Sequence, residues 1–207
     1  LVDGLAGGPV DEVEVQVEKA SRAFLARADD DRSRALFARE VQLLDRMTEV
    51  AEAARGLPDA RVRKLVDWIR DHMCPGLPPL GQAPAPGAPP AWNDTRLLIF
   101  TEYDDTKRWL RDQLQAAIAA TDRADRRIEV FHGPTPPPKR REIQKAFNGD
   151  LAKYPLRILI ATDAAREGLN LQAHCWNLFH FDVPWNPNRL EQRNGRIDRK
   201  LQPHDVV

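Results

Sequence analysis

The sequence predicts an α/β fold: a parallel sheet with helices on both faces, preceded by an N-terminal helical segment. Short apolar runs alternate with amphipathic stretches in the C-terminal half of the chain, at residues 96–101, 128–131, 157–161 and 177–181. Strands that alternate with helices form parallel sheets, because each helix carries the chain back to the edge where the next strand begins. The N-terminal part instead has helical periodicity, and a proline-rich stretch separates the two parts.

Apolar residues of the N-terminal part recur at helical spacing. Three stripes can be followed: Val13, Val17, Ala20 and Phe24; Leu36, Leu43, Leu44, Met47 and Val50; and Val62, Leu65, Val66, Ile69 and Met73. Spacings of three, four and seven residues place such side chains on one helix face. Asp59 is a suitable N-cap for the third helix, because its carboxylate can accept a hydrogen bond from an unpaired N–H of the first turn. We therefore expect residues 1–74 to form a helical segment.

Residues 75–93 are rich in Pro, Gly and Ala and predict a linker or mobile loop. Prolines lack an N–H donor, and the segment has few side chains to bury. A proline-rich docking motif is an alternative, although no P-x-x-P with flanking specificity residues is present. The remaining residues, 94–207, form the predicted α/β domain.

The composition is that of a soluble globular protein of one or two domains. The 207 residues are 42% hydrophobic and 30% charged, with a formal net charge of +0, so overall charge favours no particular partner. No apolar run approaches the length that crosses a membrane. The two cysteines, Cys74 and Cys175, fit a reducing cytoplasm, and a disulfide between them is the alternative. No Cys/His spacing resembles a metal site. The chain begins at Leu1 and not at Met, so we expect it to be a piece of a longer polypeptide.

The motif Q-x-x-G-R-x-x-R near the C-terminus predicts a phosphate-binding surface. Asn186 is a suitable N-cap and Pro187 suits the first turn, so a helix is expected to begin there. If that helix continues, Gln192, Arg196 and Arg199 fall at i, i+4 and i+7 and share one face. Planar, permanently charged guanidinium groups suit a polyphosphate and can stabilise the charge that develops in phosphoryl transfer. The alternative is a solvated, arginine-rich helix end.

Further polar segments follow the other predicted strands. They read LLIFTE at residues 97–102, VFHG at 130–133, ATDAAREGLNLQ at 161–172 and DVPWNP at 182–187. A helix after the second of these segments carries Lys139, Arg140 and Arg141. Ligands of parallel sheets bind beyond the carboxyl ends of the strands, which is where each of these segments falls.

Taken in order, these segments closely resemble the second RecA-like lobe of superfamily-two helicases. Within that superfamily they are similar to the SWI/SNF-type translocases. Three motifs are particularly similar to those of the bacterial RapA-like branch: G-L-N-L-Q, D-x-P-W-N-P and E-Q-R-x-G-R-I-D-R. The resemblance covers residues 96–202, about half of the chain. It implies that residues 94–207 are a helicase C-terminal domain, truncated at its C-terminal end, and that residues 1–74 are an inter-lobe or bracing segment.

The resemblance assigns nucleotide-binding roles to five positions. Gln192 would reach toward the γ-phosphate, and Arg196 and Arg199 would be arginine fingers. Gly168 and Asn170 would approach the nucleotide, although many relatives outside this branch have Asp at the position of Asn170. For Gly168 the alternative is a tight turn, because glycine lets the backbone adopt conformations closed to other residues.

The resemblance also implies contacts with a nucleic-acid backbone. Thr162 would make one of them, and Thr101 either makes another or simply ends its strand. Lys139, Arg140 and Arg141 are expected to contact phosphates through their charge and position, with a solvated helix face as the alternative.

Trp185 is expected to be a packing anchor, and we find no catalytic role for His132.

Two motifs of a complete ATPase are absent from the sequence. There is no G-x-x-x-x-G-K-[ST] loop and no D-E-x-H or D-E-x-D box at the end of an apolar strand. The resemblance therefore implies that a first RecA-like lobe of the same polypeptide supplies most of the site for ATP and Mg²⁺. We expect this fragment alone to fold but not to hydrolyse ATP.

The sequence predicts the second motor lobe of an ATP-dependent translocase or helicase that acts on nucleic acid, with double-stranded DNA favoured over RNA. One alternative is a motor subunit of a restriction or anti-phage system, whose motifs are the same. Another is a degenerate RecA-like interaction module, against which the intact Gln192, Arg196 and Arg199 argue. No membrane partner is expected, and any protein partner is left open.

Overall fold

The structure, a computed structural model, describes residues 15, 19, 31–54, 56–163 and 170–198. Its contacts divide the chain into two units, Leu1–Leu57 and Pro58–Val207. The first unit contains helix α2 (Asp31–Ala54), of which no residue is buried. The predicted second helix is thus confirmed, and its apolar stripe is exposed. The predicted first helix is described only at Val15 and Lys19, which are helical, and otherwise lies outside the described residues.

The second unit contains a sheet of four parallel strands in the order β2-β3-β1-β4. The strands are β1 (Leu97–Thr101), β2 (Ile128–Phe131), β3 (Ile158–Thr162) and β4 (Asn177–His180). Each lies within one residue of its predicted position at either end, because runs of Leu, Ile, Val and Phe favour strands that are buried on both faces. The predicted α/β class with a parallel sheet is therefore confirmed.

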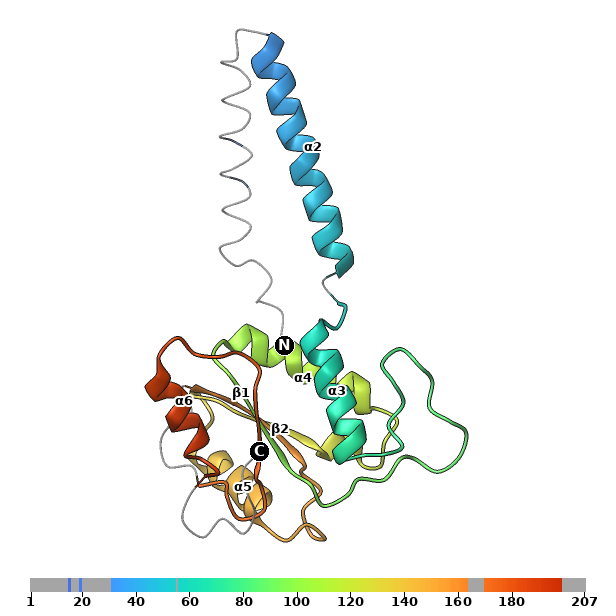
Figure 1. Ribbon diagram of the computed structural model, residues 1–207, viewed down its shortest axis with the longest axis vertical. Helices are drawn as coiled ribbons and strands as arrows, with labels where there is room; N and C mark the ends of the chain where they lie inside the picture. Colours follow the sequence, from blue (N-terminus) through green and yellow to red (C-terminus); the bar gives the residue numbers. More distant parts are fainter. Residues whose placement is uncertain (1–14, 16–18, 20–30, 55, 164–169, 199–207) are drawn as a thin grey trace, which may run out of the picture. The chain divides into compact units, whose positions relative to one another are not determined.

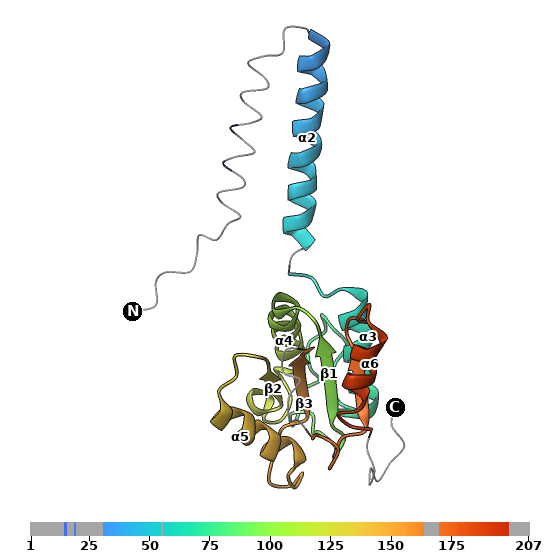
Figure 2. The same ribbon diagram turned by 90° about the vertical axis from the view of Figure 1, so that its left-hand side faces the viewer.

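Helices cover both faces of this sheet (Figures 1 and 2). They are α3 (Ala60–His72), α4 (Asp104–Ile118), α5 (Pro137–Asn148) and α6 (Pro187–Asn194), with a 3₁₀ turn at Ala124–Arg126. Alternate residues of a strand point to opposite faces. Leu97 and Ile99 accordingly pack with α3 and α4, whereas Leu98 and Phe100 pack with α5 and with Ile197 beyond α6.

Helix α3 begins as the sequence predicts. The Asp59 carboxylate accepts a hydrogen bond from the Val62 N–H at 2.8 Å, and the apolar stripe of α3 is buried against the sheet. The proline-rich segment after α3 has no regular secondary structure but is tied to the unit. Asp122 N donates to Pro90 O at 3.0 Å, and Trp92 Nε1 donates to the Thr121 hydroxyl at 2.9 Å.

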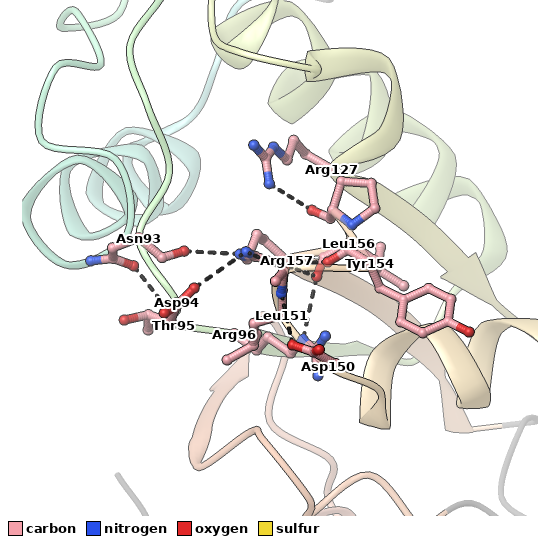
Figure 3. Close-up of polar contacts among 12 residues, drawn as sticks. Asn93, Asp94, Thr95, Arg96, Arg127, Asp150, Leu151, Tyr154, Leu156 and Arg157 are labelled. Carbon is pink, nitrogen blue, oxygen red and sulfur yellow. Dashed lines mark hydrogen bonds and ion pairs between the residues drawn. The ribbon is translucent and has the colours of Figure 1, made fainter.

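Three buried arginines hold the amino edge of the sheet (Figure 3). Arg96, Arg127 and Arg157 stand directly before β1, β2 and β3, and their exposed fractions are 0%, 2% and 4%. Their guanidinium groups donate mainly to backbone carbonyls of nearby loops. A buried charge is tolerated only when its hydrogen bonds are satisfied, and these carbonyls satisfy them.

Arg96 closes the C-terminal end of α5. Its guanidinium donates to the carbonyls of Ala146 at 3.1 Å and Gly149 at 2.9 Å, and also to that of Phe147. The last carbonyls of a helix lack partners within the helix and carry partial negative charge, so a cation is favourable there. Burial lowers the pKa of Arg96 to about 10, and the charge of Arg157 acts in the same direction. Because this value still lies well above 7, the guanidinium remains protonated at neutral pH.

Replacement of Arg96 by methionine should lower the free energy of unfolding by about 3 kcal/mol or more, because the carbonyls at the end of α5 would stay buried without donors. Urea denaturation followed by circular dichroism measures the change.

The matched control is Arg111→Met, which removes a half-exposed ion pair with Asp112 on α4 and should leave the unfolding midpoint nearly unchanged. Equal midpoints for the two variants would show that Arg96 does not hold the amino edge.

Candidate nucleotide and nucleic-acid interface

Polar side chains from three strands meet at the carboxyl edge of the sheet. Thr101 ends β1, Asp163 directly follows β3, and Asp182 lies two residues beyond β4. Helix α6 adds Arg193, which is 2% exposed. Parallel strands bring their carboxyl ends to one edge, so residues far apart in sequence converge at the position where such folds bind ligands.

Asp182 connects the end of β4 to the end of β1. Its carboxylate accepts hydrogen bonds from the Thr101 hydroxyl at 2.5 Å and from the Glu102 N–H at 2.9 Å. Thr101 is 0% exposed. Its hydroxyl is therefore buried and already donating, which favours the alternative that Thr101 simply ends its strand, and its contact with nucleic acid stays a prediction.

Arg193 is held between two carboxylates. Its Nε and Nη2 donate to the two carboxylate oxygens of Asp163 at 2.7 and 2.9 Å. Its Nη1 donates to the Asp182 carbonyl at 2.6 Å, and its Nη2 also donates to the Asp182 carboxylate at 3.1 Å. Burial alone would lower the pKa of Arg193, but the hydrogen bonds and charges of Asp163 and Asp182 raise it above its usual value. Such a paired guanidinium is permanently charged and fixed in direction.

The sequence motifs assign no role to Arg193, Asp163 or Asp182. One signal was available: both aspartates directly follow apolar runs, where parallel sheets place functional side chains. The pairing itself joins residues 30 positions apart, which no local pattern reveals.

Helix α6 begins as predicted but ends earlier than the motif suggested. Asn186 is its N-cap, accepting from Asn188 N at 3.0 Å, and Pro187 is its first residue. The helix ends at Asn194, and Ile197 N bonds to Asn194 O at 3.1 Å in a tighter turn. Ile197 is 0% exposed in the core of the sheet. Burial of this side chain turns the chain toward the sheet.

The prediction that Gln192 and Arg196 share one helix face is therefore wrong, because Arg196 lies in the turn after α6. Gln192 is exposed on α6 and Arg196 is half-buried. The carbonyl of Arg196 accepts a hydrogen bond from Leu171 N at 3.2 Å, so this turn lies against the segment that follows β3. Arg199 lies outside the described residues.

Of the other predicted nucleotide residues, Asn170 belongs to the segment that follows β3. Asn170 is exposed, and its carbonyl accepts hydrogen bonds from the side chains of Gln144 and Asn148 on α5, at 3.3 and 2.5 Å. Gly168 lies outside the described residues. Thr162, the predicted backbone contact, is the last residue of β3 and is 3% exposed. The roles proposed for these residues stay predictions.

The predicted basic patch on α5 is partly neutralised. Lys139 pairs with Glu129 at 3.1 Å and with Glu142 at 3.4 Å. Arg140 donates to the carbonyl of Thr135 at 2.7 Å and lies over the ring of Phe131. Arg141 is exposed and is the member of the patch best placed to meet phosphates.

Trp185 is 100% exposed, which overturns its expected role as a packing anchor. It lies in the loop after β4, where Val183 is 72% exposed, and Tyr103 after β1 is 64% exposed. The carboxyl edge therefore presents large apolar side chains as well as charges. Their spacing in sequence gave no sign of this exposure.

His180 lies at the end of β4 beside this network. Its Nε2 is 3.0 Å from the side-chain oxygen of Asn194, the last residue of α6. Burial lowers the pKa of His180 below its usual value of 6.5, the hydrogen bond to Asn194 opposes this effect, and the charge of Arg193 adds to it.

Comparisons with known proteins identify the family to which this domain belongs. Residues 92–200 match the family model of the helicase conserved C-terminal domain. The chain is 38% identical over 116 residues to the uncharacterized ATP-dependent helicase YqhH of Bacillus subtilis, covering 55% of this chain and 18% of that protein. It is 46% identical over 50 residues to the RNA polymerase-associated protein RapA of Klebsiella pneumoniae, covering 24% of this chain and 5% of that protein. The chain thus spans only a small part of both relatives.

Two solved structures share the fold. The C-terminal part of the Fun30 ATPase domain aligns with a TM-score of 0.50 and 18% identity, covering 91% of this chain and 57% of that one. The Hef helicase domain of Pyrococcus furiosus aligns with a TM-score of 0.51 and 17% identity, covering 91% and 34%. In the described part of the chain, no helix has the length and apolarity needed to cross a bilayer.

Lowering the pH should destabilise the unit that contains His180. A histidine whose folded pKa lies below 6.5 takes up a proton more readily when unfolded, so its contribution is complete above pH 6.5 and is lost as the pH falls through the folded pKa. Urea midpoints measured at pH 7.5 and at about pH 5.5 should therefore differ less in His180→Gln than in the wild type. If the urea midpoint changes equally with pH in the two proteins, His180 does not contribute to the pH dependence of stability.

Proposed function

Because the chain belongs to the helicase conserved C-terminal domain family, we propose that it is the second motor lobe of an ATP-dependent translocase that moves along nucleic acid. Double-stranded DNA is the favoured track, since the motifs resemble those of SWI/SNF-type enzymes. The observation that carries the proposal is the carboxyl edge. There α6 presents Gln192 to solvent and leads directly into the turn with Arg196, while Arg193 anchors the helix to β3 and β4.

In this proposal ATP binds between two lobes. A first lobe, expected in the same polypeptide, supplies the phosphate loop and the carboxylates for Mg²⁺. This lobe supplies Gln192, Arg196 and Arg199 to the γ-phosphate and Asn170 and Gly168 to the nucleoside. Arginines that meet the triphosphate only when the lobes close stabilise charge that develops in the transition state. Closure and reopening then drive movement, and this lobe alone does not hydrolyse ATP.

Nucleic acid is proposed to bind through its backbone. Thr162 at the end of β3 and the exposed Arg141 on α5 are the contacts, with Lys139 and Arg140 contributing where phosphates displace their present partners. Phosphate contacts carry no sequence information, so movement along the track is largely independent of sequence.

Experiments can distinguish this proposal from two alternative functions. A motor subunit of a restriction or anti-phage system would use the same residues, and the proteins encoded beside it would distinguish the two. A degenerate interaction module would not need Arg196 at all.

In the full-length protein, Arg196→Ala should reduce the rate of ATP hydrolysis by about a thousandfold or more, because an arginine finger supplies that order of transition-state stabilisation. Arg196→Lys should recover little of it, since an ammonium group cannot reproduce the two-pronged contact. Steady-state hydrolysis with saturating duplex DNA is the measurement. Arg111→Ala, on the exposed side of α4, is the control and should match the wild type. An unchanged rate in a folded Arg196→Ala protein would favour the interaction module.

Arg141→Ala should weaken binding of duplex DNA by a similar factor for every sequence tested. It should also reduce the slope of log affinity against log salt by about one, as expected for the loss of one phosphate contact. Fluorescence anisotropy at several salt concentrations measures both quantities. A slope equal to that of the wild type would show that Arg141 does not contact phosphate and would favour the alternative, a solvated helix face.

A further inference from the structure

The ion pair between Asp163 and Arg193 joins the two halves of the proposed site. Asp163 directly follows Thr162, the proposed contact with nucleic acid, at the end of β3. Arg193 directly follows Gln192, the proposed contact with the γ-phosphate, on α6. Asp163 and Arg193 are 30 positions apart in the sequence, whereas their side chains meet at 2.7 Å.

The geometry of this pair resists sliding or rotation. Two parallel hydrogen bonds join the Arg193 guanidinium to the two oxygens of Asp163, and the groups are 2% and 5% exposed. The remaining Nη1 donor is taken by the Asp182 carbonyl at 2.6 Å, and the guanidinium lies 5.6 Å from the centroid of the Phe100 ring. A bidentate pair fixes both distance and orientation, so a displacement of the end of β3 must either break the pair or carry α6 with it.

We propose that Arg193 is a positioning residue that couples the nucleic-acid contact at the end of β3 to the nucleotide contacts on α6. This inference rests on the proposed function. Nucleic acid that binds at Thr162 shifts the preferred position of Asp163. Because Arg193 is bonded to Asp163, α6 shifts with it, and this changes the positions of Gln192 and of the turn that carries Arg196. Arg193 itself touches neither ligand. Its second carboxylate partner, Asp182, holds the guanidinium against β4 while the coupling operates.

The test uses the full-length protein and the variants Arg193→Lys and Asp163→Asn. Lysine keeps the charge but cannot form two parallel hydrogen bonds, and asparagine keeps the shape of Asp163 but removes its charge. ATP hydrolysis is measured with and without saturating duplex DNA. We expect the ratio of stimulated to basal rate to fall by about tenfold, an ordinary size for coupling between two sites. The basal rate should fall by a smaller factor, because Arg193 also anchors the helix that carries the nucleotide contacts.

The ratio separates coupling from a purely structural role. If Arg193 only supports the fold, both rates fall in proportion and the ratio stays at the wild-type value, which overturns the inference. The double variant should lose no more stimulation than either single variant, because both remove the same contact. Arg111→Lys makes the same substitution in an exposed arginine–aspartate pair on α4 and should keep the full ratio.

The result for the wild type separates failure of the proposed function from failure of the role of Arg193. A wild-type protein whose hydrolysis is not stimulated by DNA or RNA overturns the proposed function. A stimulated wild type with folded variants of unchanged ratio overturns only the role of Arg193. If thermal unfolding shows that neither variant folds, hydrogen exchange on the wild type decides. Duplex DNA should slow amide exchange in peptides covering α6, and an unchanged rate there overturns the coupling.

Discussion

Buried guanidinium groups set the geometry of both edges of this parallel sheet. A charge that leaves water must have its hydrogen bonds satisfied, so each buried arginine dictates where its acceptors lie. At the amino edge the acceptors are mainly carbonyls of the loops that enter the strands and of the C-terminal end of α5, and Arg96 and Arg157 each donate to several of them. At the carboxyl edge the acceptors of Arg193 are carboxylates and one carbonyl. The strands are only four or five residues long, so these contacts fix loops that the sheet itself cannot hold.

The two edges differ in what their arginines do. The carbonyl acceptors at the amino edge belong to loops that enter the strands and to the end of α5, so the arginines there hold these segments in place. Carboxylates at the ends of β3 and β4 belong to segments that carry proposed ligand contacts, and a change there can reach α6 through Arg193. The guanidinium group thus holds loops in place at the amino edge. At the carboxyl edge it links the ends of β3 and β4 to the helix that carries the proposed nucleotide contacts.

Local patterns predicted those features whose causes are local. Apolar runs located all four strands, and the capping chemistry of Asp59 and Asn186 located the starts of α3 and α6. The end of α6 was missed because the helical period continues through Arg196 while the burial of Ile197 diverts the chain. The partners of Thr101 and Arg193 were missed because they lie 81 and 30 residues away. For the site, the residue types and the shared edge could be predicted, but not which side chains face a ligand and which hold the edge together.

The complete exposure of Trp185 gives this lobe a built-in optical probe. The four other tryptophans, Trp68, Trp92, Trp109 and Trp176, are all half-buried, whereas the indole of Trp185 stands entirely in water at the edge where the proposed ligands arrive. An indole that leaves water changes its emission wavelength and its accessibility to a soluble quencher. Anything that covers this edge will therefore register in the natural fluorescence of the protein, with no attached dye.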